Sequence, residues 1–389
     1  ALVKKYFGKT PPAKLPRPVY TTEPTQRGPR EIVLRREGNA ERIEMGYHIP
    51  ALTHPDTYPL MVLDQVLSGG RSSRLYQALV ETQLATSAWS SAGSRRDPAL
   101  FMLGATARQG VTAEALEKAL VEQVEKAKTT LPTADEMQAA KNQLEAYFVF
   151  QNDSVSDQGE QLGYYNTLAT WQYGESIIPK VEAVTPEQVQ KVARKYLTED
   201  NVTIARFIPT APGGGAAAGA EPMGPMHRNR MPAAAFYTGA QDGGQMAASG
   251  KSAAQVLSAA ASKSTIVRPH REVLPNGITV IVHENHSNPT VAIAGNVMAG
   301  SYFDPQGKNG VASLTAEMIG RGTGKRTALQ IAKETDFVGA SVQTSAGVES
   351  TNFSTRSLKK DLPLVLDILS DELRNATFPE DQFERAKGQ

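Results

Sequence analysis

Two predicted helices meet at the stretch Leu67-Ser68-Gly69-Gly70-Arg71-Ser72-Ser73-Arg74-Leu75-Tyr76. Residues 55–67 and residues 72–82 both carry apolar side chains at helical spacing, and the glycine pair ends the first helix. A glycine-rich turn before a helix can also bind an anion, but no Gly-Lys-Ser/Thr follows, which excludes a phosphate-binding P-loop. The sequence favours helix packing and C-capping as the role of Gly69-Gly70, with the two arginines of the stretch as polar groups beside the turn.

This turn lies inside one predicted α+β domain at residues 31–208. The domain's predicted strands are residues 31–36, 41–49, 86–93, 99–107 and 202–208, and its further helices are residues 111–128 and the two that follow Thr133 and Thr185. Thr133 and Glu136 form a capping box, in which the Thr oxygen accepts from an early amide and the Glu reaches back to the cap. Thr185 repeats the device with proline at the first helical position.

Segments of different composition flank this domain. Residues 10–30 are rich in proline and indicate an extended connector, whereas Ala, Gly, Pro and Ser dominate residues 209–265, which indicates a flexible linker. The basic cluster His227-Arg228-Asn229-Arg230 lies inside this linker, and we interpret it as a solvated patch and not as a nucleic-acid site. A new domain begins near residue 266, with a turn at Leu274-Pro275-Asn276-Gly277.

The domain at residues 266–389 repeats the element order of residues 31–128, which suggests a duplicated α+β unit. Its predicted strands are residues 271–274, 278–283, 291–298, 340–345 and 349–356, and its predicted helices are residues 309–320, 327–338 and 359–375. Residues 1–9 have the pattern of a helix end, and residues 378–385 that of a helix start. We therefore expect the tail of one domain, a whole domain and the front of another, as in a piece of a longer chain.

Composition limits the classes of function. The 389 residues carry 41 Lys+Arg against 40 Asp+Glu, so the net charge of +1 gives no global field for nucleic acid or an anionic membrane. The absence of cysteine excludes disulfides, a thiolate nucleophile and Cys-ligated zinc. No apolar run approaches the ~20 residues that a membrane helix needs.

Several motifs occur in a characteristic order: Gly46-Tyr47-His48-Ile49-Pro50-Ala51, His54-Pro55-Asp56, the opening stretch, Ala140-Lys141-Asn142-Gln143-Leu144 and Val184-Thr185-Pro186-Glu187-Gln188-Val189. Through them, residues 31–208 resemble the second, inactive domain of the pitrilysin/insulinase-like zinc peptidases, a family that includes mitochondrial processing peptidase and core subunits of the respiratory cytochrome complex. The resemblance implies duplicated peptidase-family domains, each an antiparallel-rich mixed sheet packed with helices. It also makes residues 1–9 the tail of an N-terminal catalytic-type domain.

The segment from residue 271 resembles the start of a first-type domain, whose zinc motif in this family is His-x-x-Glu-His on a helix. Two imidazoles at i and i+4 bind one zinc ion, and the glutamate activates its water. The register set by Gly310-Val311-Ala312 and Gly322-Thr323 places Ser313, Ala316 and Glu317 at these positions. Because both imidazoles and the general base are missing, we expect no catalytic residue and no zinc bound to this chain, and the resemblance implies zinc in the parent protein.

Two further family features are missing at the expected positions. The family's third zinc ligand is an acidic residue that would fall near or beyond Gln389, so Glu380 and Glu384 are poor candidates. The family also holds substrate with an Arg and a Tyr seven residues apart in the last domain of its inactive half; the corresponding positions here are Val80 and Ser87, as expected for a domain of the zinc-bearing half.

The histidines do not form a metal-binding pattern. His48 lies in a predicted strand, and His54 precedes a helix, where a cap or surface group is expected. His283 and His286 lie at a strand end, where side chains three residues apart diverge. We interpret these histidines as structural, since no acidic or histidine partner stands at metal-site spacing.

Two functions therefore remain open from the sequence. In the first, the chain is the non-catalytic part of a zinc endopeptidase and forms chamber wall and substrate scaffold for peptides or unfolded protein, next to a catalytic domain or a homologous subunit. In the second, it is an inactive assembly subunit like those of processing peptidase or the respiratory complex. The resemblance implies a periplasmic or exported location.

Overall fold

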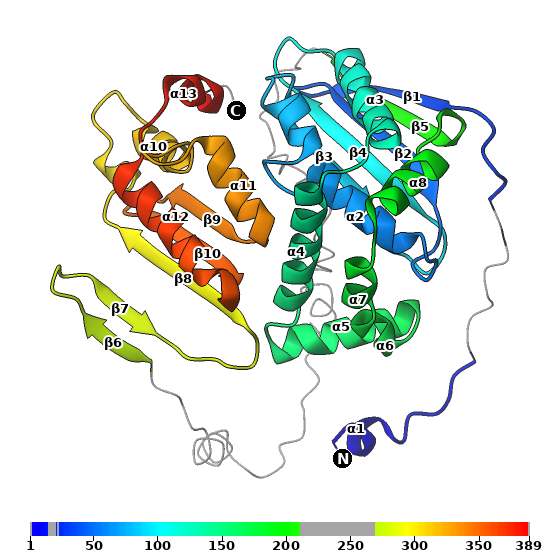
Figure 1. Cartoon of the computed structure of the whole chain (residues 1–389), viewed down its shortest axis with the longest axis horizontal. Coiled ribbons are helices and arrows are strands. Elements are labelled where there is room, and N and C mark those ends of the chain that lie inside the picture. Colours follow the sequence, from blue (N-terminus) through cyan, green and yellow to red (C-terminus); the bar gives the residue numbers. More distant parts are fainter. Residues whose placement is uncertain (1, 15–20, 22, 211–268, 388–389) are drawn as a thin grey trace, which may run out of the picture.

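The computed structural model describes residues 2–14, 21, 23–210 and 269–387. Most of the predicted linker, including its basic cluster at residues 227–230, lies outside these described residues. Helix α1, Leu2–Phe7, has exposed apolar side chains. Two folded parts follow, which we call the first unit (residues 23–210) and the second unit (residues 269–387) (Figure 1).

A five-stranded mixed sheet forms the centre of the first unit. Its strands are β1 Arg30–Glu37, β2 Arg42–Ile49, β3 Ala85–Ala92, β4 Ala99–Ala107 and β5 Val202–Thr210, in the order β1-β5-β2-β4-β3. β1 runs parallel to β5, and every other neighbouring pair is antiparallel. The predicted antiparallel-rich mixed sheet is therefore confirmed.

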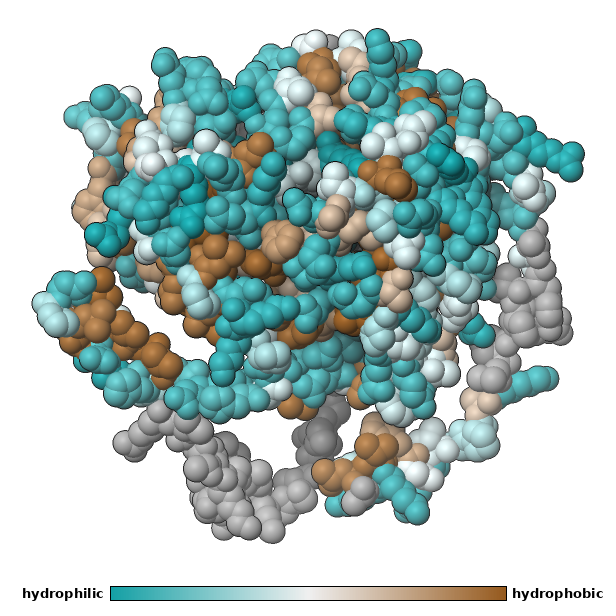
Figure 2. Space-filling view, viewed as in Figure 1, coloured by the Kyte–Doolittle hydropathy of each residue, from teal (hydrophilic) through white to brown (hydrophobic). Residues whose placement is uncertain are grey.

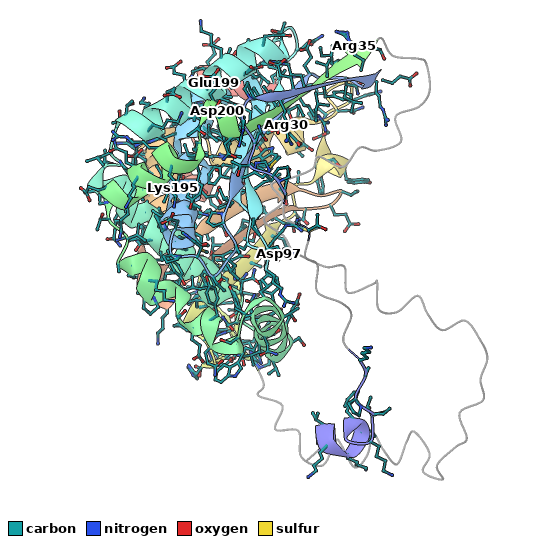
Figure 3. The ribbon with its side chains drawn as sticks, turned by 90° about the vertical axis from the view of Figure 1, so that its right-hand side faces the viewer. Arg30, Arg35, Asp97, Lys195, Glu199 and Asp200 are labelled. Atoms are coloured by element: carbon teal, nitrogen blue, oxygen red, sulfur yellow. The ribbon has the colours of Figure 1, made fainter. Side chains whose placement is uncertain are left out.

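Helices cover one face of this sheet. Helices α2 (Thr57–Ser68), α3 (Ala113–Thr129) and α8 (Pro186–Tyr196) lie over the strands (Figure 1). The alternating β2 residues Ile43 and Met45 point into the resulting core, with at most 1% of either side chain exposed. β1 forms an outer edge, where every residue is exposed and where Arg30 and Arg35 lie (Figure 3).

The first unit differs from the sequence prediction in two places. The predicted helix at residues 72–82 is shorter in the structure. Tyr76–Val80 form a π-helical turn, in which the Glu81 N–H donates to the Tyr76 carbonyl. Three unpredicted helices follow α4 (Ala134–Phe150): α5 Val155–Leu168, α6 Trp171–Glu175 and α7 Ile177–Glu182. The apolar periodicity of α5 and α6 is weak, since neither helix has a buried residue.

The second unit contains a three-stranded antiparallel sheet with helices beside it. The strands are β8 Thr290–Val297, β9 Ser341–Ala346 and β10 Thr351–Leu358, in the order β8-β10-β9. The helices are α10 Val311–Ile319, α11 Ala328–Val338, α12 Leu362–Asn375 and α13 Glu380–Lys387. Both units thus follow the predicted succession of strands, two helical segments, two paired strands and a helix.

The predicted turn at residues 274–277 joins a separate hairpin of β6 (His270–Val273) and β7 (Thr279–Val282). Among the described strands, this pair forms a sheet of its own and does not extend the sheet of β8. Ile278 and Ile281 are 56% and 63% exposed, and hydrophobic residues follow the hairpin in the space-filling view (Figure 2).

Helices α4 and α11 bring the two units together (Figure 1). The C-terminal end of α11 lies against the middle of α4 and against the turn that follows α2. The stretch at residues 67–76 therefore lies at the contact between the units.

Candidate functional site

Helix α10 carries the three positions that the sequence predicts to correspond to the zinc motif. Gly310 caps its N-terminus, and the Asp304 carboxylate accepts from the Gly310 and Ala312 N–H groups at 2.7 and 2.8 Å. Ser313 is exposed, Ala316 is 2% exposed and faces the core, and Glu317 is exposed. Ser313 and Glu317 therefore share the outer stripe of the helix, four residues apart.

The Glu317 carboxylate pairs with two arginines. Its carboxylate forms an ion pair with Arg321 one turn later, and Arg71 of the first unit lies 3.8 Å from the same oxygen. Arg321 is 3% exposed, and the Glu317 carboxylate raises its pKa against the opposing effect of burial. Both guanidinium groups contact the same Glu317 oxygen, so a metal ion at this carboxylate would meet two neighbouring positive charges.

A second acidic residue lies close to this cluster. Glu372 on α12 is 3% exposed, and its side-chain oxygen is 3.4 Å from the position where a Cβ on Gly320 would stand. Burial raises the pKa of Glu372 to about 7, although the positive charge of Arg71 opposes the shift. Glu372 is therefore a proton-binding group near neutral pH at the contact between the units.

The residues present do not fit a zinc ion. Ala316 has no donor atom, and the Glu317 carboxylate is held by arginine. Zinc sites in proteins need three or four nitrogen, sulfur or oxygen ligands. Within residues 2–14, 21, 23–210 and 269–387, no three His, Cys, Asp or Glu side chains converge in this way. Glu380 and Glu384 lie on α13, where Glu384 is 3.5 Å from Lys387.

Several of the described histidines contact other groups of the protein. His48 lies 3.1 Å from the Asn201 amide oxygen and 3.4 Å from Glu23. His54 accepts from the Asp56 N–H at 3.1 Å just before α2, whose N-cap residue is Asp56. His286 lies beside Glu284 at 3.3 Å, whereas His283 is exposed.

The positions that correspond to the family's substrate-holding pair do not form a polar site. Val80 is 6% exposed in the π-helical turn, and Ser87 lies on β3. Arg74, in the stretch at residues 67–76, instead donates twice to Glu136, at 2.7 and 2.9 Å. This bond ties the short helix to the capping box of α4.

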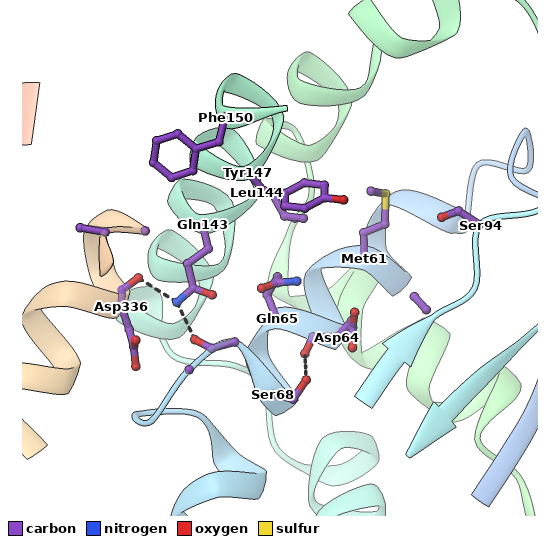
Figure 4. Close-up of a pocket in the computed structure, with 15 residues that line it drawn as sticks. Met61, Asp64, Gln65, Ser68, Ser94, Gln143, Leu144, Tyr147, Phe150 and Asp336 are labelled. Atoms are coloured by element: carbon purple, nitrogen blue, oxygen red, sulfur yellow. Dashed lines mark hydrogen bonds between the residues drawn. The ribbon is translucent and has the colours of Figure 1, made fainter. Parts of the chain in front are cut away.

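A cavity of about 460 Å³ lies where the two units meet (Figure 4). Met61, Leu144, Tyr147 and Phe150 give it apolar walls, and its polar lining comes from Asp64, Gln65, Ser68, Ser94, Gln143 and Asp336. Asp64 accepts from the Ser90 hydroxyl at 2.5 Å, and Ser68 lies 2.9 Å from the same hydroxyl. Asp64, Ser68 and Ser90 thus bond to one another, and the apolar residues of α4 line another part of the cavity.

Sequence reasoning missed the residues that join the units. Asp336 accepts from Ser72, and Gln143 donates to the backbone of both units at 2.7 Å. Asp336 lies at the end of an ordinary amphipathic helix, so its sequence context gives no sign of this partner. Gln143 belongs to a stretch that carried the family resemblance, which was the available signal.

Comparisons with known proteins agree with this geometry. Residues 1–144 match the model described as Peptidase M16 inactive domain, and residues 279–389 match the model Insulinase (Peptidase family M16). The zinc protease PqqE of Helicobacter pylori is 35% identical over 140 residues, which cover 36% of this chain and 32% of that protein. Mitochondrial-processing peptidase subunit beta of Rattus norvegicus is 32% identical over 115 residues, or 30% of this chain and 23% of that protein.

A solved structure shows the same fold. The crystal structure of a protease from Helicobacter pylori has a TM-score of 0.51 and 29% sequence identity, covering 54% of this chain and 51% of that chain. The chain spans less than a third of the length of the two curated relatives. In the described parts of the chain, no helix has both the length and the apolar character to cross a membrane.

Proposed function

Because the chain belongs to the insulinase (M16) family of peptidases through both matched segments, we propose that it is a non-catalytic part of a zinc endopeptidase. In this proposal the two units form wall and scaffold of a peptide-binding chamber, and another domain of the parent protein supplies the zinc. The substrates are peptides or unfolded protein, which family members bind as an added strand at a sheet edge.

One observation carries the proposal. Helix α10 keeps the family's surrounding glycines, but it holds Ser313, Ala316 and Glu317 where zinc ligands and general base would stand. Glu317 instead pairs with Arg321 and with Arg71 of the other unit. The helix thus supports a role in holding the units together and not in hydrolysis.

Zinc content and peptide cleavage test the catalytic part of this proposal. The purified full chain should contain no stoichiometric zinc and should not cleave an internally quenched peptide library. One tightly held zinc per chain, together with EDTA-sensitive cleavage, would overturn the proposal.

Peptide binding tests the scaffold part. A fluorescein-labelled unfolded peptide should gain anisotropy on the chain, and an unlabelled copy should compete. Absence of binding, with zinc and cleavage also absent, would favour the second function, an assembly subunit; relatives of this chain are named as processing-peptidase subunits. A periplasmic or exported location remains a prediction.

A further inference from the structure

The turn between α2 and the next helix holds a carboxylate from the second unit. The Ser72 N–H and hydroxyl both donate to one Asp336 oxygen, at 2.8 and 2.7 Å. Two donors on one oxygen, with the Arg71 guanidinium nearby, form the kind of anion-binding concavity that successive backbone N–H groups make. The sequence favours C-capping over anion binding as the role of this turn. In the structure, the turn also binds a carboxylate, that of Asp336 in the same chain.

Gly70 makes this approach possible. Its backbone has a φ of +111°, which side-chain-bearing residues rarely adopt. A Cβ at this position would stand 2.3 Å from an Asp336 carboxylate oxygen. Glycine is therefore required twice, once for the turn and once for the space that the carboxylate fills.

Two amide side chains of α4 hold the rest of the α11 terminus, and Figure 4 shows that of Gln143. Gln143 donates to the Asp336 carbonyl and to the Gly69 carbonyl, both at 2.7 Å, and Asn142 donates to the Phe337 carbonyl at 2.7 Å. The Asp336 and Phe337 carbonyls are among the last of α11, where the next turn of helix is missing, and the Asp336 carbonyl also accepts from the Gly339 N–H at 3.2 Å. The first unit thus caps a helix of the second.

Other charged contacts also join the units and are partly open to water: Arg385 pairs with Glu81, with 28% and 26% of these side chains exposed. Arg356 pairs with Asp153 at 2.6 Å with 39% and 35% of these side chains exposed, and Lys360 pairs with Glu145 at 2.8 Å with 57% and 34% exposed. Exposed pairs of this kind contribute about 0–1 kcal/mol each. Asp336 is more enclosed, and burial raises its pKa although the Ser72 donors oppose the shift.

We propose that the Gly69–Ser72 turn is a carboxylate-binding site whose ligand is Asp336 of the same chain, and that this contact fixes the second unit on the first. The inference goes beyond the proposed function, because it concerns how the units are positioned and would hold for a peptidase part and for an assembly subunit. Loss of the carboxylate leaves the Ser72 donors and the turn without their partner and frees the second unit to move.

The full chain offers a clean test because it contains no cysteine. Lys118→Cys on α3 and Arg374→Cys on α12 place spin labels on exposed positions of the two units. Double electron–electron resonance should give one narrow distance distribution for the parent. With Asp336→Ala it should become at least about twofold broader, as for a hinge that has lost its closing contact.

Matched variants separate this contact from general damage to α11. Lys333→Ala changes an exposed charge on the same helix and should leave the distribution unchanged. Ser72→Ala removes one of two donors and should broaden the distribution less than Asp336→Ala. Fluorescence of Trp89 and Trp171, both in the first unit, confirms that this unit stays folded. A folded Asp336→Ala chain with the parent distribution, or Ser72→Ala broader than Asp336→Ala, would overturn the proposal.

Discussion

Helices α2 and α10 occupy corresponding places in the two units, but their surroundings differ. Each is followed by a glycine-rich turn with an arginine, at residues 69–71 and at residues 320–322. α2 buries nine of its 12 residues between the sheet and other helices, whereas α10 buries only Ala316 and Met318 of its nine. The comparison shows that a helix followed by a glycine-rich turn can be mostly buried in a core, as α2 is, or mostly unburied beside charged side chains, as α10 is.

The difference also appears in the turns. The turn after α2 receives the Asp336 carboxylate from outside its unit, whereas Thr323 after α10 donates to Asp371 of its own unit at 2.5 Å. The first turn therefore acts between the units and the second within one. Variants that change one member of each pair can break or sharpen this contrast.

The largest expected effect is on the core beneath α2. Leu63→Ala removes a side chain that is 1% exposed and should lower the free energy of unfolding of the first unit by about 3–5 kcal/mol. Leu314→Ala on α10, which is half-buried, should cost about 1–2 kcal/mol. Urea denaturation followed by tryptophan fluorescence reports the first unit, and circular dichroism adds the second. Equal losses would contradict the contrast between the helices.

The next effect concerns the pH dependence of the second unit. Glu372 has its pKa raised by burial from 4.5 to about 7, so the folded unit binds a proton more tightly than the unfolded chain does. Its contribution to stability is complete below pH 4.5 and is lost as the pH rises toward 7, by on the order of 3 kcal/mol.

Glu372→Gln should remove this loss, so that the variant gains stability relative to the parent as the pH rises from 5 to 8. Urea denaturation at both pH values, followed by circular dichroism, measures the difference. Exposed Glu380→Gln serves as the control and should follow the parent. A parent and a Glu372→Gln chain with parallel pH profiles would show that burial does not retain the proton.

A smaller effect is expected where the short helix is tied to α4. Arg74→Ala removes both donors to Glu136 and should lower the stability of the first unit by about 1.5–3 kcal/mol, as for hydrogen bonds to charged groups. Arg71→Ala, whose partner Glu317 is 3.8 Å away across the contact between the units, should change this stability by less than about 1 kcal/mol. Tryptophan fluorescence in urea distinguishes the two, and the reverse order would contradict the assignment.

The smallest effect is on the helix caps. Thr133→Ala on α4 and Thr327→Ala on α11 each break a capping box and should each cost about 1 kcal/mol. The substitutions to Ser keep the hydroxyl and should cost much less. Because Glu136 is also bound by Arg74, the double variant Thr133→Ala/Arg74→Ala should show non-additive losses, whereas Thr327→Ala/Arg74→Ala should be additive.

Local signals in the sequence were sufficient for most elements. Capping boxes at Thr133 and Thr327, the proline after Thr185 and the alternating apolar residues of β2 fix helices and strands through interactions within a few residues. Helices α5 and α6 were missed because neither has a buried residue, so the apolar period that indicates a helix is weak, and α7 has only six residues, although Ile177 and Val181 are buried. The π-helical turn at Tyr76–Val80 also left no mark in the side-chain pattern.

The sequence by itself determined the family order of motifs and the antiparallel-rich α+β units, and it predicts that Ser313, Ala316 and Glu317 stand where the family has its two zinc-binding histidines and its general base. Only the tertiary structure decided which turn meets which carboxylate, that Glu317 faces arginines of both units, and that Glu372 is buried. Asp336 and Ser72 are 264 residues apart. A contact of that kind depends on how two packed units meet, and no periodicity or capping rule along the chain contains that information.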